Sequence, residues 1–562
     1  MITSLPRRDD QAGWARLLCL LGGATILIYL YLALFEPGTL QYAPFTIQDD
    51  ARQFHLWMPR LVDPGLLPGD RIADYWQTVS PPLYRYLFAA ATRLGIDPLL
   101  FGRLLPAPLL ALALMGSWRL ALRLSGNPRH AFIAAGFMLI YLLHDDSIYS
   151  ASPRAFSPIL LIFFLEAMLA GRTWLMMLCL LLLETTYPSS AVIAIAVLGL
   201  RQIKRGGRLG FTMSLRSVML MAGAGIVLVA ATVPFKTSTR GWGPVVTLQQ
   251  ALQNANTGTP TGRSAIVDDS GRIGWVCNAR MGFVPEIMPC NRNIPGAPIV
   301  DVLLLVPLVL SAIKAARGKR DPETSERDLV YFHVLLATAI CFAIAAVLAF
   351  QLHLPSRYSQ RILGMLEWLA IGQMAAAWLD RKGRIAGAAA GGLIIISFFT
   401  PTPGFQRPLD PALIRHIAAL PRNARIAGVS EELNAVPAIT GRSIMGAPEQ
   451  AIPWHTRYFG IIEGGLRDSL VAVSTRDPET FEAALDRLGA TYLVVELPMF
   501  TTGKIPGRYG IVLPDAVEEA ERSMASGKTV LATHASACTT YAGPIMMLLD
   551  VRCLRSAAIR QP

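Results

Sequence analysis

Long apolar runs separated by short polar stretches dominate the first 400 residues of the chain. Runs long enough to cross a membrane, at roughly 17–25 residues each, lie near 14–35, 99–122, 131–143, 156–171, 173–186, 188–201, 214–234, 298–316, 329–351, 362–379 and 385–400. These are eleven runs, of which three are short, so the pattern predicts about eleven spans. From residue 401 onward, strand-like runs (ARIAGVS, ATYLVVEL, MMLLDVRC) alternate with a helical one, DPETFEAALDRLG. The sequence therefore predicts an α-helical polytopic membrane domain at 1–400 and a small α/β domain at 401–562.

The composition supports a membrane protein. Of the 562 residues 53% are hydrophobic and 16% are charged, against about 25% charged in ordinary soluble domains. The mean hydropathy is +0.42. This balance excludes an ordinary soluble protein.

The net charge of +12 reflects topology. Lys and Arg concentrate in short stretches between the apolar runs, at 6–8, 123–130, 201–208, 316–320 and 380–384. The positive-inside rule places these stretches and the N-terminus in the cytoplasm. The outer face then receives the loops at 36–98, 144–155, 235–297 and 352–361, together with the tail from 401. No compact basic domain remains, so we expect no nucleic-acid partner.

Cysteine usage agrees with this topology. Cys19, Cys179 and Cys341 lie within predicted spans, where cysteine behaves as a small hydrophobic residue. The other cysteines fall in outer regions, where an oxidising compartment permits disulfides. Four outer cysteines allow three connectivities. We favour the local pairs, which join Cys277 to Cys290 and Cys538 to Cys553.

The first outer loop, at 36–98, carries the candidate catalytic residues. Asp49 and Asp50 follow the first span closely, which places them at the outer membrane surface. Paired carboxylates at this depth are able to bind a divalent cation, or one of them is able to deprotonate an acceptor hydroxyl. The alternative is an acidic, solvated loop with an interfacial aromatic belt.

An acidic pair in this position, with about eleven spans and an outer C-terminal domain, resembles the C-type (GT-C) glycosyltransferase superfamily. That superfamily includes protein O-mannosyltransferases, aminoarabinose transferases acting on lipid A, and oligosaccharyltransferases. The resemblance implies an integral membrane hexosyl- or pentosyltransferase with a polyprenyl-phosphate-linked sugar donor, and a catalytic role for Asp49 and Asp50. It also implies a glycan, lipid or protein acceptor at the outer face of a bacterial inner membrane, with a periplasmic C-terminal domain. The sequence contains no WWDYG-like signature of oligosaccharyltransferases, so we expect no transfer to asparagine.

The second outer loop, LHDDSIYSASPRAFSP, holds a candidate metal site. His144, Asp145 and Asp146 are adjacent there, and members of the superfamily often place a second acidic cluster in this loop. Histidine with carboxylates suits Mg²⁺ or Mn²⁺ better than a closed zinc site. The alternative is solvation of the loop and capping of the next helix.

Arginines near the outer ends of spans form a third set of candidates: Arg85, Arg103, Arg154, Arg357 and Arg361. The positive-inside rule disfavours arginine at this face, so these residues need another explanation. A guanidinium binds phosphate oxygens in a bidentate way, and a polyprenyl phosphate would lie at this depth. Snorkelling, or pairing with the loop aspartates, is the alternative.

The outer loop at 235–297 is rich in Gly, Pro and Asn. It is expected either to cover the catalytic cleft or to act as a spacer.

Two other classes of function compete with glycosyl transfer. A transporter of lipid-linked sugars would place ionisable residues deep in its spans. A polysaccharide polymerase or ligase, or a non-catalytic assembly partner, would differ in fold and would usually carry its chemistry in a large late outer loop.

Overall fold

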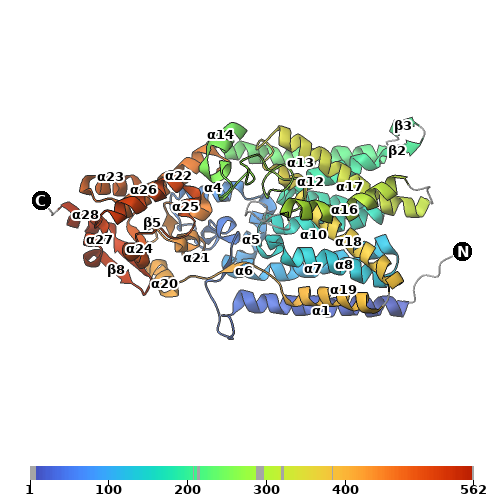
Figure 1. Ribbon diagram of the computed structural model, residues 1–562, viewed down its shortest axis with the longest axis horizontal. Coiled ribbons are helices and arrows are strands. Elements are labelled where there is room, and N and C mark those ends of the chain that lie inside the picture. The colour runs from blue at the N-terminus through green and yellow to red at the C-terminus, as the bar shows by residue number, and fades with distance from the viewer. Residues whose placement is uncertain are drawn as a thin grey trace.

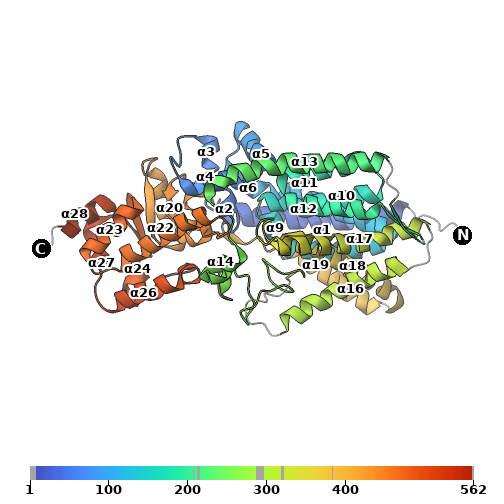
Figure 2. The ribbon, with the colours of Figure 1, turned by 90° about the horizontal axis from the view of Figure 1, so that it is seen from above.

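The computed structural model describes residues 8–206, 208–211, 215–286, 296–317, 322–382 and 384–559. A bundle of long helices forms one end of the elongated molecule and a sheet covered by helices forms the other (Figure 1). A view turned by 90° shows the same separation, with the sheet region at the end of the bundle opposite the start of the first helix (Figure 2).

Each of the predicted apolar runs coincides with helical structure. The helices are α1 (Arg8–Leu34), α6 (Pro98–Leu104) with α7 (Pro106–Ser125), α8 (Pro128–His144), α10 (Phe156–Leu169), α11 (Thr173–Thr186), α12 (Pro188–Arg201), α13 (Leu215–Thr239), α16 (Ala297–Arg317), α17 (Pro322–Val347), α18 (Gln360–Lys382) and α19 (Arg384–Phe399). Within the described ranges, 5 helices are long and apolar enough to cross a membrane, and four shorter apolar helices accompany them. The chain is therefore a polytopic membrane protein, while the count of about eleven passages and their orientation stay predictions.

Small residues allow the central helices to approach closely. A Cβ atom on Gly372 of α18 would lie 2.7 Å from the Cα of Ala134 in α8, a distance that packed atoms do not adopt. A Cβ atom on Gly364 of α18 would lie 2.5 Å from the ring of Tyr141, also in α8. Glycine lets α18 approach the α8 backbone at Gly372 and the Tyr141 ring at Gly364, and such close approach helps helices to associate in lipid.

The C-terminal region contains a five-stranded sheet in the order β6-β5-β7-β9-β8. The strands are β5 (Arg425–Val429), β6 (Ser443–Ile444), β7 (Tyr492–Glu496), β8 (Thr539–Ala542) and β9 (Met546–Asp550). β5 is parallel to β6 and β7, whereas β9 is antiparallel to β7 and β8. Helices α22 (Thr456–Ser474), α23 (Pro478–Leu488) and α26 (Pro514–Ala525) accompany the sheet. The α/β class predicted for the tail is confirmed, while the boundary between residues 400 and 401 stays a prediction.

The disulfide between Cys538 and Cys553 is confirmed, with Cα atoms 5.4 Å apart. Cys19, Cys179 and Cys341 are free, as predicted. The other predicted pair, Cys277 with Cys290, falls partly outside the described residues, because Cys290 is not among them.

Replacing Cys538 and Cys553 together by serine should lower the stability of the C-terminal region by about 3 kcal/mol, because the bond closes a short loop and restricts the unfolded chain. Hydrogen-exchange protection of the β5 and β7 amides, measured at increasing urea concentrations, would give the change in the free energy of unfolding. Unchanged protection of these strands would contradict it.

Candidate functional site

A short β-ribbon holds the backbone in front of the acidic pair. β1 (Ile47–Gln48) pairs antiparallel with β4 (Phe405–Gln406), which begins the C-terminal region. The Asp49 N–H donates to the carbonyl of Gly404 at 3.1 Å. The Gln48 side-chain oxygen accepts from the N–H of Asp50 at 2.8 Å. The backbone of the acidic pair is therefore held by Gln48, just before it in the chain, and by Gly404, which follows the last apolar run.

Asp49 faces cations from two parts of the chain. Its carboxylate forms an ion pair with Arg52 of α2 (Ala51–Phe54). Arg508, in the C-terminal region, approaches the same oxygen at 3.8 Å. The Asp49 side chain remains 32% exposed, so solvent reaches it.

Asp50 meets the second outer loop through Arg154. Arg154, in the 3₁₀ turn Pro153–Ala155, forms ion pairs with Asp50 and, at 3.2 Å, with Asp146. The structure therefore brings the acidic pairs of the two outer loops together across one guanidinium. Enclosure by the surrounding protein and the adjacent Asp145 carboxylate raise the pKa of Asp146 to about 6. Because 53% of its side-chain surface is still accessible, Asp146 faces an opening within that enclosure.

Arg357 and Arg361 lie beside Arg154. Arg357 stands in the 3₁₀ turn Pro355–Tyr358, and Arg361, in the first turn of α18, donates to the Ser147 hydroxyl. The guanidinium Nε of Arg357 is buried and has no hydrogen-bond partner in the described part of the chain. Burial, followed by the charges of Arg361 and Arg357, lowers the pKa of Arg154. Three guanidinium groups thus come together, and the Nε of each is buried without a hydrogen-bond partner among the described residues.

Tyr187, which the sequence analysis did not identify, completes this arginine group. It lies in the turn between α11 and α12, and Arg361 stacks over its ring at 5.4 Å. Burial alone would raise the pKa of Tyr187, but the positive charges of Arg357, Arg361 and Arg154 outweigh it and lower the pKa to about 8. Its place between two apolar runs at the predicted outer face was the available signal.

The outer loop at 235–297 packs against the arginine group in its described part. The N–H of Ser356 donates to the carbonyl of Arg280 at 3.3 Å. The Gln360 side-chain amide donates to the carbonyl of Asn278 at 2.9 Å. Burial, followed by the charge of Arg357, lowers the pKa of Arg280 to about 10. This position favours the expectation that the loop covers the site over the expectation that it is a spacer.

The predicted metal ligands do not gather into a set. Nδ1 of His144 donates to the carbonyl of Ile140 at 2.9 Å, within its own helix. Asp145 accepts from the N–H of Ser147 at 2.6 Å and so caps α9 (Asp146–Tyr149). The described ranges contain no group of three or more His, Cys, Asp or Glu side chains that could hold a metal ion. Because Arg154 pairs with Asp50 and Asp146, the candidate ligands do not fit a divalent cation in this arrangement.

Two of the predicted arginines have different surroundings. Arg103 is buried and donates to the carbonyl of Ala43 at 2.6 Å and to the Tyr42 hydroxyl at 2.6 Å. These bonds connect α6 to the segment that follows α1. Arg85 is exposed on α5 (Pro82–Arg93) and forms no ion pair within the described ranges. The structure does not bring it into the group around Arg154.

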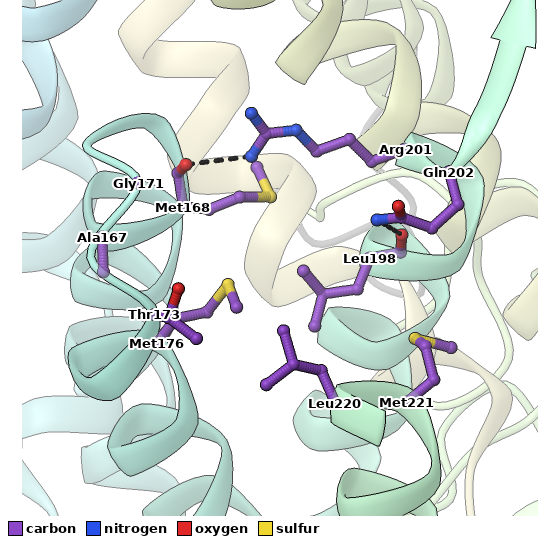
Figure 3. A pocket seen from close by; sticks show the side chains of 10 residues that line it. All are labelled: Ala167, Met168, Gly171, Thr173, Met176, Leu198, Arg201, Gln202, Leu220 and Met221. Carbon is purple, nitrogen blue, oxygen red and sulfur yellow. Dashed lines mark hydrogen bonds between the residues drawn. The ribbon is translucent and has the colours of Figure 1, made fainter. Parts of the chain in front are cut away.

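A cavity of about 260 Å³ lies between the far ends of α10, α11, α12 and α13 (Figure 3). Methionine and leucine make up half of its lining residues, and Arg201 donates to the Met168 carbonyl at 2.9 Å. Arg154 precedes α10, whereas Met168 stands near its C-terminal end. The 14-residue helix, about 21 Å long, separates this cavity from the arginine group.

Comparisons with known proteins give likenesses in structure. No protein-family model matches the chain, and a search of the curated proteins gave no significant match. Among solved structures, the chain is similar to the oligosaccharyltransferase of Archaeoglobus fulgidus tethered with an acceptor peptide containing the NVT sequon. The TM-score is 0.47 and the identity 11%, over 91% of this chain and 72% of that chain.

Two other structures of the same archaeal enzyme are similar at 11% identity. The apo form gives a TM-score of 0.41 over 88% of this chain and 71% of that chain. The complex with zinc and sulfate gives 0.42 over 85% and 68%. At TM-scores below 0.5, these likenesses carry no argument about this chain.

Proposed function

We propose that the protein is a membrane glycosyltransferase that moves a sugar from a polyprenyl-phosphate donor to an acceptor at the outer face of a bacterial inner membrane. One observation carries this proposal: Asp50, which follows Asp49 in the chain, pairs with Arg154, and the charges of Arg361 and Arg357 act on that same guanidinium. Carboxylates and guanidinium groups side by side are what a displacement at a phosphate-linked carbon requires.

The arginine group supplies a site for the phosphate of the donor. The buried Nε of Arg357 has no acceptor among the residues that the structure describes, and leaving such a group unpaired costs about 1–3 kcal/mol. Phosphate oxygens would satisfy it in charge-assisted hydrogen bonds. The isoprenoid tail would then lie among the apolar helices.

Transfer follows from this placement in one displacement. The acceptor hydroxyl oxygen forms a bond to C1 of the sugar while the bond from C1 to the phosphate oxygen breaks. Asp49 or Asp50 takes the hydroxyl proton, and the departing polyprenyl phosphate keeps the bonding electron pair beside the arginines. Binding of the phosphate to Arg154 also releases Asp50 from its ion pair, which makes that carboxylate a stronger base.

A divalent cation such as Mg²⁺ or Mn²⁺ is part of what the sequence predicts, and the observed donor set does not fit it. No step above requires the ion. Transfer measured with EDTA and then with added Mn²⁺ or Mg²⁺ decides the requirement.

A transfer assay with purified protein in liposomes tests the proposed function. The donors are polyprenyl-phosphate hexoses and pentoses, and the acceptors are glycan, lipid and peptide fractions of a bacterial envelope. We expect sugar to appear on an acceptor together with an equal amount of free polyprenyl phosphate. Intact donor with every sugar and every acceptor fraction would overturn the proposal.

Transport of a lipid-linked sugar is a second candidate, favoured by one observation. Glu184 of α11 and Glu367 of α18 are buried, and their carboxylate oxygens lack hydrogen-bond partners in the described part of the chain. Ionisable groups inside spans are typical of transport pathways. Movement of intact donor across the liposome bilayer, without release of polyprenyl phosphate, would favour this candidate over transfer.

The pKa of Tyr187 predicts how the KM for donor depends on pH. Because its pKa is about 8, Tyr187 is neutral below pH 8 and becomes a phenolate above it. The phenolate would compete with the donor phosphate for Arg357, Arg361 and Arg154. We therefore expect the KM for donor to rise between pH 7 and 9, with no such rise in Tyr187→Phe, which keeps the ring beneath Arg361. Parallel KM profiles for the two proteins would contradict this role.

A further inference from the structure

Glu449 is a buried carboxylate in the C-terminal region that the mechanism above does not use. It lies in the 3₁₀ turn Pro448–Gln450 and is 1% exposed. Its backbone N–H donates to the Asn434 side chain at 2.8 Å, which fixes the turn on its own region. A buried carboxylate persists only where partners compensate for its lost hydration.

The partners of Glu449 come from three separate parts of the chain. Oε1 accepts from Gln53 at 2.6 Å and from Arg263 at 2.5 Å. Oε2 accepts from Arg508 at 2.7 Å and from Arg52 at 3.3 Å. Glu449 therefore joins the first outer loop, the loop at 235–297 and the C-terminal region at one point.

Two of these partners also contact Asp49. Arg52 forms an ion pair with Asp49, and Arg508 lies 3.8 Å from the same oxygen. Glu449 and Asp49 thus share two guanidinium groups. If Glu449 loses its charge, Arg52 and Arg508 keep Asp49 as their shared carboxylate. Both guanidinium groups would then move toward Asp49 and neutralise its charge.

We propose that Glu449 is a positioning residue for Asp49, acting through Arg52 and Arg508, so that docking of the C-terminal region keeps Asp49 free to receive a proton. The catalytic part of this inference rests on the proposed function. The geometric part, that Glu449 holds the segment around Asp49, does not depend on it. Glu449 is not a catalytic residue, since no substrate atom needs to contact it.

Glu449→Gln tests the inference, because glutamine keeps the size of the side chain and removes its charge. We expect kcat to fall roughly 10- to 100-fold, as for a small misplacement of a reacting group. The KM for donor should stay unchanged, since Arg154, Arg357 and Arg361 are untouched. Arg487→Gln serves as the matched control: it removes one partner of an exposed pair with Asp468 at 2.8 Å in the same region, and kcat should not change.

A double variant separates positioning from a general loss of structure. If Glu449 acts through Asp49, Glu449→Gln should cost nothing further in an Asp49→Asn background. Losses that multiply in the double variant would overturn the inference, as would an unchanged kcat in the single variant.

Amide hydrogen exchange gives a readout that does not need activity. In Glu449→Gln, the amides of residues 51–54 should exchange faster, while those of β5 and β7 should not change. Faster exchange in all these segments would indicate lost folding and would overturn the inference. Faster exchange at 51–54 alone, in a protein whose wild type transfers no sugar, would support the geometric link and contradict only the proposed function.

Discussion

The double replacement Asp49→Asn/Asp50→Asn should reduce sugar transfer by about 10²–10⁴-fold, the usual loss when a general base is removed. Asparagine keeps the shape of both side chains but cannot take a proton from an acceptor hydroxyl. The β1–β4 pairing and the backbone bond from Asp49 to Gly404 do not involve either carboxylate, so the segment should keep its place. Initial rates at saturating donor measure the effect.

The same replacement should change stability measurably. Asp49 and Asp50 are 32% and 21% exposed and pair with Arg52 and Arg154, so their removal leaves two enclosed guanidinium groups with fewer acceptors. A cost of about 1–3 kcal/mol follows, more than an ordinary surface substitution would give. Rates are therefore compared only for protein that is folded, as judged by its thermal transition. A folded double variant that transfers at the wild-type rate would remove both residues from the mechanism.

Arg357→Ala should weaken the use of donor more than it weakens folding. A cation that stabilises charge on the leaving group is worth about 10²–10³ in rate. In this structure the Arg357 guanidinium forms no ion pair within the described ranges, and its Nε has no acceptor. Its removal therefore breaks no protein contact of comparable strength. We expect a lower kcat/KM for donor and a thermal transition close to that of the wild type.

Arg522→Ala is the matched control for Arg357→Ala. Arg522 forms an exposed pair with Glu518 at 2.9 Å on α26, far along the chain from the arginine group. Its removal should leave both kcat/KM and the thermal transition unchanged. Equal losses in the two variants would show that Arg357 contributes only general charge.

Local patterns account for the part of the fold that could be predicted. Apolar runs identified the helices because a span must bury its backbone polar groups in helical hydrogen bonds. Strand-like runs and one helical run identified β5, β7, β9 and α23 in the tail. The contact between Arg52 and Glu449 joins residues 397 positions apart, and nothing local in the sequence marks either as the partner of the other.

The candidate site was predictable in its residue types and less so in its pairings. The aspartates of the two outer loops meet through Arg154, which sequence position alone did not reveal. Arg103 donates to the Ala43 carbonyl and the Tyr42 hydroxyl rather than to the loop aspartates. His144 bonds within its own helix because it ends α8, where a last-turn carbonyl is within reach. Periodicity predicts which face a residue occupies, whereas such pairings depend on the assembled tertiary structure.

A structure of the protein in a lipid nanodisc with a polyprenyl-phosphate sugar bound tests the central claim most directly. The account predicts the phosphate against Arg154, Arg357 and Arg361, the sugar C1 facing Asp49 and Asp50, and the isoprenoid tail among the helices. A donor phosphate bound elsewhere, for example beside Arg201 at the cavity on the opposite end of α10, would contradict it.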